Sequence, residues 1–410
     1  MTPQQIYVGT QGFMAVLLST MQTTYGLYAV KTAGLGPLEL VLVGTALELS
    51  ITVAEVPTGV VADVYSRRLS VLIGFAIIGI GVVTMGAVPT FPGLALGSML
   101  MGIGYTFISG AHQAWLADEI GDASPTPVFV RGTQATQIGR LAGVPVGVTL
   151  ASVDLRLPFF VSGVGYWVLL ALLALLMTER GYAPAARHRE TPWASMQRTL
   201  SDGIAAVRDR PALASLLAIV LLVGMSGEGL GRLSPLHFID TIGLPERFSE
   251  ATWFGVLSAG SYLGGAIVVT LAGRAAAHDD PRRLLRVLLG LTLLMALATF
   301  VFAAAPGFWP ALLGFWGARW VRLSMPPLVT AFVNRGLASN VRATVLSMVG
   351  QADAIGEVAG GPLVGFIGTL RGVRTALMTA AGILLPATAL YARALSRLSP
   401  VPPTSAPHRP

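Results

Sequence analysis

The sequence predicts an all-α integral membrane protein with twelve transmembrane helices in two pseudo-symmetric bundles of six. Hydrophobic residues make up 53% of the 410 residues and charged residues only 11%, the apolar residues form long continuous blocks, and one segment repeats about half a chain later. Soluble domains usually carry about 25% charged residues. This chain therefore lacks the polar cover that a water-facing surface needs.

The apolar blocks are long enough to cross a bilayer. Phe159–Met177 contains no charge, and a span needs about 20 apolar residues. Hydrocarbon admits only helices or closed barrels, and runs that do not alternate disfavour a barrel. With loops, proline, glycine and charges as boundaries, we place spans at 6–30, 37–62, 70–89, 93–116, 130–153, 157–178, 211–239, 250–272, 284–304, 308–333, 342–367 and 375–395.

These spans divide the chain into four parts. The N-terminal bundle covers 1–178 and the C-terminal bundle covers 211–395, with a polar linker at 179–210 and a tail at 396–410. Within the linker, Trp193–Arg210 has the pattern of a short amphipathic helix that lies on the membrane surface.

The distribution of Lys and Arg predicts the orientation. If the N-terminus is cytoplasmic, most basic residues fall on the cytoplasmic side. The loops of the other side hold only Lys31, Arg156, Arg247, Arg371 and Arg374. This asymmetry follows the positive-inside rule. We therefore expect both termini and the linker to be cytoplasmic, and the first apolar segment to be retained as a span.

Composition argues against other classes of function. The net charge of +7 is explained by arginines in short loops, so we expect no nucleic acid partner. The chain has no cysteine, and its five histidines form no metal-binding pattern. Glycines such as those in Gly227–Gly231 lie in apolar stretches and indicate helix packing rather than a phosphate loop. We expect no enzymatic activity, no metal and no cofactor.

An internal repeat supports two related halves. Gln134–Pro145 aligns without gaps on Gln351–Pro362, with seven identities in twelve positions and an offset of 217 residues. The repeat equates the fifth span with the eleventh, and duplicated halves are typical of transporters. The small residues and prolines that we expect at close helix contacts are Gly139, Gly143, Pro145, Gly360, Gly361 and Pro362.

The loop after the second span carries the strongest motif. It reads Gly59-Val-Val-Ala-Asp63-Val-Tyr-Ser66-Arg67-Arg68. This resembles the G-x-x-x-D-x-x-G-R-K/R signature of the major facilitator superfamily (MFS), with Ser66 in place of the second glycine. Three further strings are similar to bacterial exporter-like members: Glu55–Asp63, Ala114–Glu119 and Arg342–Ser347. The resemblance covers essentially the whole chain. It implies the MFS fold and alternating access between the halves, in a bacterial inner membrane.

Two departures from the superfamily bear on the mechanism. The membrane-embedded arginine of the fourth-span signature is absent, and Ser98 or a neighbour occupies its place. Gly139, Gly143, Pro145 and Gly147 are similar to the fifth-span antiporter pattern, which supports antiport.

Charges near the signature loop predict a conformational latch. An acid at the end of the second span can face a helix N-terminus or an arginine, and acids at the end of the fourth span lie on the same side of the membrane. Such a cluster would hold the halves together in the outward-facing state; the alternative is that the arginines only anchor topology. The latch residues are Gly59, Asp63, Arg67, Arg68, Asp118 and Glu119.

Ionisable residues inside spans are costly, so each is a functional suspect. We expect them to point at one another or at water. They are Glu48, Glu55, Arg140, Glu228, Arg232, Arg319, Arg322, Asp353 and Glu357.

Asp353 and Glu357 are four residues apart and share one face of the eleventh span. Two carboxylates at that spacing in a low dielectric cannot both ionise cheaply, so we expect one of them to take up a proton. The alternative is a structural pair with Arg319 or Arg322 on the tenth span. Further proton-coupling candidates are Glu228, Glu48, Arg319 and Arg322.

Glu228 and Arg232 are also four residues apart, and they predict an ion pair within one helix. Glycines beside Glu228 suggest instead a locally loosened helix next to a cavity. We expect Arg140 to pair with Glu48 or Glu55.

The resemblance implies that the first, fourth, seventh and tenth spans line a central cavity. Aromatic side chains with a few polar groups favour an amphipathic organic cargo over a sugar; packing is the alternative for each aromatic, and His112 is also a possible proton relay. The expected cargo residues are Gln22, Tyr25, Tyr28, Tyr105, His112, Gln113, Arg232, Trp316 and Trp320.

Together these observations predict a secondary active transporter. We expect proton-coupled efflux of small amphipathic organic compounds by antiport, with a proton-coupled uptake symporter as the alternative. The expected partners are the lipid bilayer and a small-molecule substrate, and we expect a monomer that uses a proton gradient rather than a cofactor.

Overall fold

The computed structural model describes residues 1–121, 124–182, 211–275, 280–336 and 339–397, and every element in these ranges is a helix. The N-terminal bundle consists of α1 (Pro3–Lys31), α2 (Pro37–Val64), α3 (Arg67–Ala87), α4 (Phe91–Ile120), α5 (Thr126–Val153) and α6 (Leu157–Leu176). The C-terminal bundle consists of α8 (Pro211–Leu236), the π-helix η1 (His237–Ile242), α9 (Glu250–Ala275), α10 (Pro281–Ala304), α11 (Phe308–Gly336), α12 (Ser339–Arg371), α13 (Val373–Ile383) and α14 (Leu385–Arg397).

The helices confirm the predicted span order. The seventh span is α8 continued by η1, and the twelfth is α13 and α14, which are separated at Leu384. Pro386 lacks a backbone N–H and its ring clashes with the carbonyl of Gly382, four residues earlier, which explains a break between these two residues. The predicted surface helix at Trp193–Arg210 lies outside the described residues.

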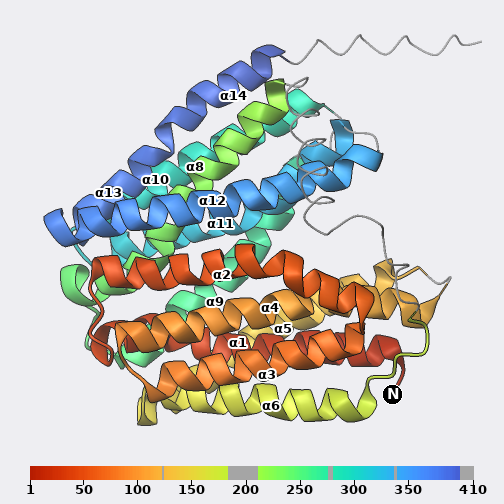
Figure 1. Cartoon of the computed structure of the whole chain (residues 1–410). Coiled ribbons are helices and arrows are strands. Elements are labelled where there is room, and N and C mark those ends of the chain that lie inside the picture. Colours follow the sequence, from red (N-terminus) through yellow and green to blue (C-terminus); the bar gives the residue numbers. More distant parts are fainter. Residues whose placement is uncertain (122–123, 183–210, 276–279, 337–338, 398–410) are drawn as a thin grey trace, which may run out of the picture.

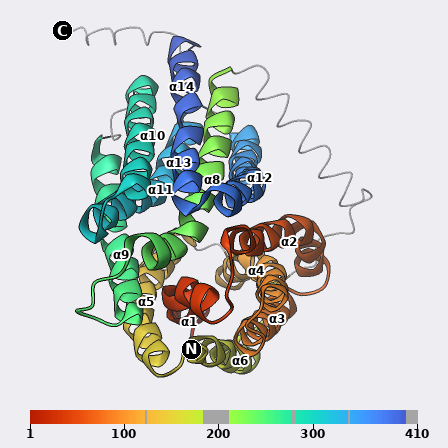
Figure 2. The ribbon, with the colours of Figure 1, turned by 90° about the vertical axis from the view of Figure 1, so that its left-hand side faces the viewer.

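The two bundles lie one above the other in Figure 1. The chain begins at one face of the molecule, and α14 ends at that same face, which we call the terminal face. This arrangement requires an even number of crossings, as predicted. The other face, where α1 turns into α2, is called the loop face. Figure 2 views the molecule from the loop face and shows the helices of the two bundles as two groups.

Eight of the described spans are long and apolar enough to cross a membrane by composition alone. The helices that fall short are α1, α5, α11 and α12, although each has at least 28 residues. Three of these, α5, α11 and α12, carry Arg140, Arg319, Arg322, Asp353 and Glu357. The polarity of these three helices therefore comes in part from charges that they supply to the interior.

Each half contains a seam at which two helix backbones meet closely, and the two seams occupy equivalent positions. In the first seam, Gly139 and Gly143 of α5 approach carbonyl groups of α1. In the second seam, Gly356 and Gly360 of α12 approach the backbone of α8. The seam glycines differ by the 217-residue offset of the sequence repeat, so the fold supports the duplication.

Contacts between the halves gather at the loop face. Lys31 of α1 forms an ion pair with Glu250 of α9 at 3.1 Å. Gly26 of α1 lies against Pro235 of α8, and Gly361 of α12 lies against Val41 of α2. From these contacts α2 and α12 diverge toward the terminal face (Figure 1).

The α1–α5 seam leaves no room for a side chain, so we predict that Gly143→Ala destabilises the protein. A Cβ at Gly143 would lie 2.5 Å from the carbonyl oxygen of Val16, and overpacking of this kind costs about 1–3 kcal/mol. Unfolding of the purified protein in detergent measures the loss. Gly290→Ala on α10, where nothing lies within 4 Å, is the matched control. A Gly143→Ala variant as stable as this control would contradict the close seam.

Candidate functional site

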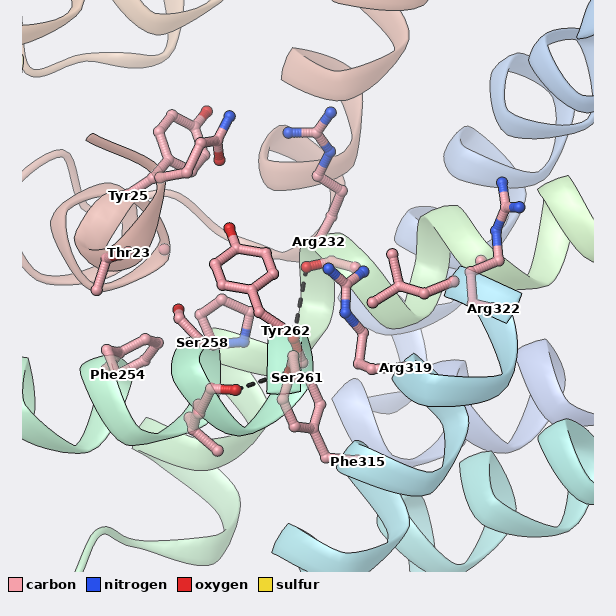
Figure 3. A pocket seen from close by; sticks show the side chains of 18 of the residues that line it. Thr23, Tyr25, Arg232, Phe254, Ser258, Ser261, Tyr262, Phe315, Arg319 and Arg322 are labelled. Carbon is pink, nitrogen blue, oxygen red and sulfur yellow. Dashed lines mark hydrogen bonds between the residues drawn. The ribbon is translucent and has the colours of Figure 1, made fainter. Parts of the chain in front are cut away.

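A cavity of about 540 Å³ lies between the two bundles. Its wall combines helices of the first half (α1, α2 and α5) with helices of the second (α8, η1, α9, α11 and α12). Figure 3 shows that Arg232, Tyr262 and Arg319 extend toward the same space from different helices. Its charged lining residues are Arg140, Glu228, Arg232, Arg319, Arg322 and Glu357.

One ion pair in the wall lies within a single helix. The Nε atom of Arg232 donates to Glu228 Oε1 at 2.9 Å, four residues earlier on α8. Gly44 of α2 faces this pair so closely that a Cβ there would overlap both side chains. The predicted pair is therefore confirmed, and a glycine of the other half makes room for it.

A second network joins α11 to α12. One guanidinium nitrogen of Arg322 donates to Asp353 Oδ2 at 2.7 Å and to Glu357 Oε1 at 3.1 Å. The spacing of four residues brings both carboxylates to one face of α12, and Gly227 of α8 leaves space beside Arg322. Of the two predicted partners, Arg322 forms the bridge.

The other oxygen of Asp353, Oδ1, is buried and has no hydrogen-bond partner among the described residues. Buried polar atoms are nearly always paired, and an exception calls for an explanation. The proton that the sequence predicts on one of these two carboxylates would supply one, because a protonated carboxyl needs less compensation than an ionised one. The structure thus confirms the bridge to Arg322, one of the two alternatives for these acids, and proton uptake stays a prediction.

Two arginines of the wall have no acidic partner within the described ranges. Arg140 lies over the ring of Tyr262, with 5.9 Å from its Cζ atom to the ring centroid. The expected pairing of Arg140 with Glu48 or Glu55 does not form: Glu48 is half-buried on α2, where its charge acts on the Glu228 and Arg322 groups instead, and Glu55 is exposed. Arg319 forms no ion pair or hydrogen bond in the described part of the chain.

Of the predicted cargo residues, Gln22, Tyr25 and Arg232 line the cavity. Tyr28 does not, because it is fully buried and its hydroxyl donates to the carbonyl of Met85 at 2.6 Å. Tyr105 is 48% exposed and Gln113 is exposed, both away from the wall. The fourth span contributes no lining residue, so the implied lining by the first, fourth, seventh and tenth spans is only partly right.

The remaining three cargo candidates serve helix packing. His112 is buried beside the rings of Tyr7 and Trp115 inside the first bundle. Trp316 and Trp320 of α11 donate from their indole N–H groups to backbone carbonyls of α9, at 3.1 and 2.8 Å. These two rings fasten α11 to α9 instead of facing a ligand.

The loosened helix expected at the α8 glycines is not found. The chain stays α-helical through Gly227, Gly229 and Gly231, and the helical pattern changes only after Pro235, where η1 begins. Gly229 packs against Val364 of α12. Gly227 and Gly229 therefore accommodate neighbouring side chains, whereas nothing lies within 4 Å of a Cβ placed at Gly231.

The predicted latch residues brace the first half in this conformation. Arg67 pairs with Asp118 and also donates to the carbonyl of Ala114. Glu119 accepts from the backbone N–H groups of Arg180 and Gly181. The contacts described for this cluster all join α2, α3 or α4 to other parts of the N-terminal bundle or to the segment that follows α6.

Two other members of the cluster follow the same pattern. Arg68 donates through its backbone N–H to Glu179 at 3.0 Å, and the Asp63 carbonyl accepts from the Tyr182 hydroxyl at 2.8 Å. Gly59 lies in open space. A latch between the halves stays a prediction, for a conformation in which the terminal face closes.

Sequence reasoning missed most of the uncharged lining. α9 contributes Phe254, Ser258, Ser261 and Tyr262, and α11 contributes Phe315. Ser and Phe are common in apolar helices, and nothing in their spacing separates a lining position from a packed one. The signal for a lining position that the sequence did offer was the charge of Arg140 on α5, because a buried charge without an acidic partner must face a cavity.

The comparisons with known proteins agree with this architecture. The family profile described as Major Facilitator Superfamily matches residues 6–320. The chain is 21% identical over 361 residues to the MFS-type transporter YxaM of Bacillus subtilis, a match that covers 86% of each chain. It is 24% identical over 126 residues to the MFS-type transporter YdeE of Escherichia coli, a match that spans 30% of this chain and 32% of that relative.

Solved structures show the same fold. The nucleoside transporter NupG superposes with a TM-score of 0.78 at 14% identity, over 97% of this chain and 100% of that one. A bacterial homologue of the human lysosomal transporter Spinster, in an inward-facing and unoccupied conformation, gives a TM-score of 0.76 at 16% identity, over 97% and 99% of the two chains.

Because the halves meet at the loop face, we predict that the cavity is reached from the terminal face. The chain has no cysteine, so Ser258→Cys in the cavity wall and Val153→Cys at the loop-face end of α5 can each be labelled alone. A membrane-impermeant maleimide should modify Ser258→Cys from the terminal face and Val153→Cys from the loop face. Labelling in vesicles of both orientations measures this, and preferential labelling of Ser258→Cys from the loop face would refute it.

Proposed function

Because the chain belongs to the Major Facilitator Superfamily, and is therefore a secondary transporter rather than an enzyme, we propose that a proton gradient drives it. In this proposal a small organic compound binds in the cavity between the halves, and Asp353 and Glu357 carry the proton. The observation that carries the proposal is the bridge from Arg322 to both carboxylates in the cavity wall.

The bridge supports coupling because it connects a proton site to a cargo-facing cation. When both acids are ionised, they hold Arg322 at α12 and neutralise it. A proton on either acid weakens that hold, which leaves Arg322 with an excess of positive charge toward the cavity. Proton binding therefore changes the charge that a cargo meets. Glu228 and Arg232 on α8 and Glu48 on α2 act on the same group of charges.

The sign of coupling depends on the cargo. An exporter of the antiport type, the mode expected from the sequence, needs cargo and proton to compete, as a cationic compound would for the acids. A symporter needs proton and cargo to favour each other, as an anion would for the freed Arg322. The charge of the cargo therefore separates the two modes.

The setting of the transport cycle is part of the proposal. We place both termini in the cytoplasm of a bacterial inner membrane, on the asymmetry of Lys and Arg, and the protein acts as a monomer without a cofactor. With this orientation, contact of the halves at the loop face corresponds to an inward-facing conformation. The predicted latch would form when the terminal face closes.

We predict that Glu357→Gln and Asp353→Asn abolish proton coupling while the protein still folds. Each change keeps the shape of the side chain but removes its titration, so a pH gradient loses its effect. Proteoliposomes that contain a pH-sensitive dye would report proton movement on addition of cargo. The test compounds are benzenesulfonate, phthalate, benzenesulfonamide and benzyltrimethylammonium, with and without an uncoupler.

Wild-type protein should show a proton flux that at least one compound triggers and the uncoupler removes. The matched control is Glu246→Gln, an exposed acid in the loop before α9, which should behave as wild type. Full proton coupling in both the Asp353 and the Glu357 variants would remove these acids as carriers. The absence of a flux with all four compounds in wild type would count against proton coupling.

A further inference from the structure

The cavity wall carries more arginine than acid. Four guanidinium groups line it, from Arg140, Arg232, Arg319 and Arg322, whereas only two carboxylates do, from Glu228 and Glu357. The acids stand on one side, on α8 and α12. Arg140 on α5 and Arg319 on α11 are the cations left over once the ion pairs are formed.

In the described part of the chain, neither Arg140 nor Arg319 makes the contacts expected of an arginine that stabilises the fold. An arginine that supports a fold normally donates to a carboxylate or to backbone carbonyls. In the described ranges, the guanidinium groups of Arg140 and Arg319 make neither contact, and Arg140 meets only the face of Tyr262. The charge on Arg319 is also opposed by Arg140, Arg232 and Arg322, which lie within electrostatic range.

An uncompensated charge at bilayer depth is costly unless a counter-ion reaches it. The described part of the wall holds no acid that could serve Arg140 or Arg319, so the counter-ion must be mobile. The aromatic rings of Phe254, Phe315 and Tyr262 line the same cavity. They would cover an apolar body, whereas a bare inorganic ion needs no such surface.

Building on the transport function proposed above, we infer that the cargo is a small organic anion, with an acidic group that Arg140 and Arg319 neutralise and an apolar body that the aromatic rings cover. The two arginines come from different bundles, so one anion satisfies a charge in each half. Guanidinium groups suit carboxylate, sulfonate and phosphate oxygens through paired hydrogen bonds.

An anionic cargo also selects the mode of coupling. Arg322 contacts Asp353 and Glu357 on α12. The other charged groups within electrostatic range of this bridge are Glu228 and Arg232 on α8, Glu48 on α2 and Arg319 on α11. A proton on Asp353 or Glu357 makes the wall more positive and strengthens the binding of an anion. Proton and cargo then load together, which is symport. This favours the alternative of uptake over export by antiport.

Binding is tested on the full-length protein in detergent, by thermal unfolding with compounds that share a ring and differ in charge. Benzenesulfonate and phthalate are the anions, benzenesulfonamide is the neutral counterpart and benzyltrimethylammonium is the cation. We expect the anions to raise the unfolding temperature of wild-type protein more than the other two compounds. The apparent affinity for the anions should be at least tenfold weaker in Arg140→Gln and Arg319→Gln. It should be partly restored in Arg140→Lys and Arg319→Lys, which keep the charge but not the paired hydrogen bonds.

A second readout separates a ligand-binding role from a structural one. Without ligand, Arg140→Gln and Arg319→Gln relieve an uncompensated charge, so they should unfold at the same temperature as wild type or higher. The matched control is Arg156→Gln, an exposed arginine between α5 and α6, which should keep full anion protection. Protection by the cation or the neutral compound alone, protection by no compound, or anion protection unchanged in both glutamine variants would overturn the inference.

The binding test and the proton-flux test fail independently. Anion protection in a protein whose proton flux ignores anions would leave the cargo assignment intact and refute proton coupling. A proton flux driven by benzyltrimethylammonium, with no anion protection, would keep proton coupling and refute the anionic cargo.

Discussion

The constraint behind this structure is that charges inside hydrocarbon must find compensation within the protein. Ionised side chains at bilayer depth are costly, and this chain places both acids and arginines on its interior helices. Two groups of charges satisfy one another, Glu228 with Arg232, and Arg322 with Asp353 and Glu357. The helices that carry the charges therefore have to surround a common polar interior, and the cavity lies there.

Glycine makes this compensation possible at close range. The Glu228–Arg232 pair fits against Gly44, and Arg322 fits beside Gly227, so neighbouring backbones enclose the ion pairs and keep lipid away from them. The pairs and the helix packing are thus parts of one arrangement. A side chain at Gly44 would displace the Glu228–Arg232 ion pair. A substitution at Gly44 should therefore have an effect similar to the removal of one of these two charges.

The fold could be predicted from the sequence, because long apolar blocks and their boundaries are local properties of the chain. The pairing of Glu228 with Arg232 was likewise predictable from helix geometry. The cavity lining was not, since whether an aromatic residue faces a ligand depends on the neighbouring helix. Tyr28 and Trp316 have the composition of binding residues, but each donates a hydrogen bond to a backbone carbonyl of another helix. The partner of Arg140 could not be inferred either, because Glu48 lies on α2 among the charges of the opposite bundle.

The sequence repeat also gains a meaning that the alignment alone did not provide. Arg140 and Glu357 occupy corresponding positions, one on α5 and the other on α12, and both line the cavity. The duplicated halves thus present opposite charges from equivalent places. The pseudo-symmetry of the backbone is accompanied by an asymmetry of charge, with a guanidinium group from one half and a carboxyl group from the other.

The contacts at the loop face have a mechanical consequence. The backbone seams within each half make each bundle stiff, whereas the contacts between the halves that the described residues show lie between the loop face and the middle of the molecule. The loop-face end can therefore serve as a fulcrum and each long helix as a lever. α2 has 28 residues, and at 1.5 Å per residue it is about 42 Å long. A tilt of about 10° at the fulcrum would move its far end by about 7 Å. In the transport cycle proposed above, small changes in charge balance near the middle of the molecule would therefore open or shut a passage wide enough for a small molecule.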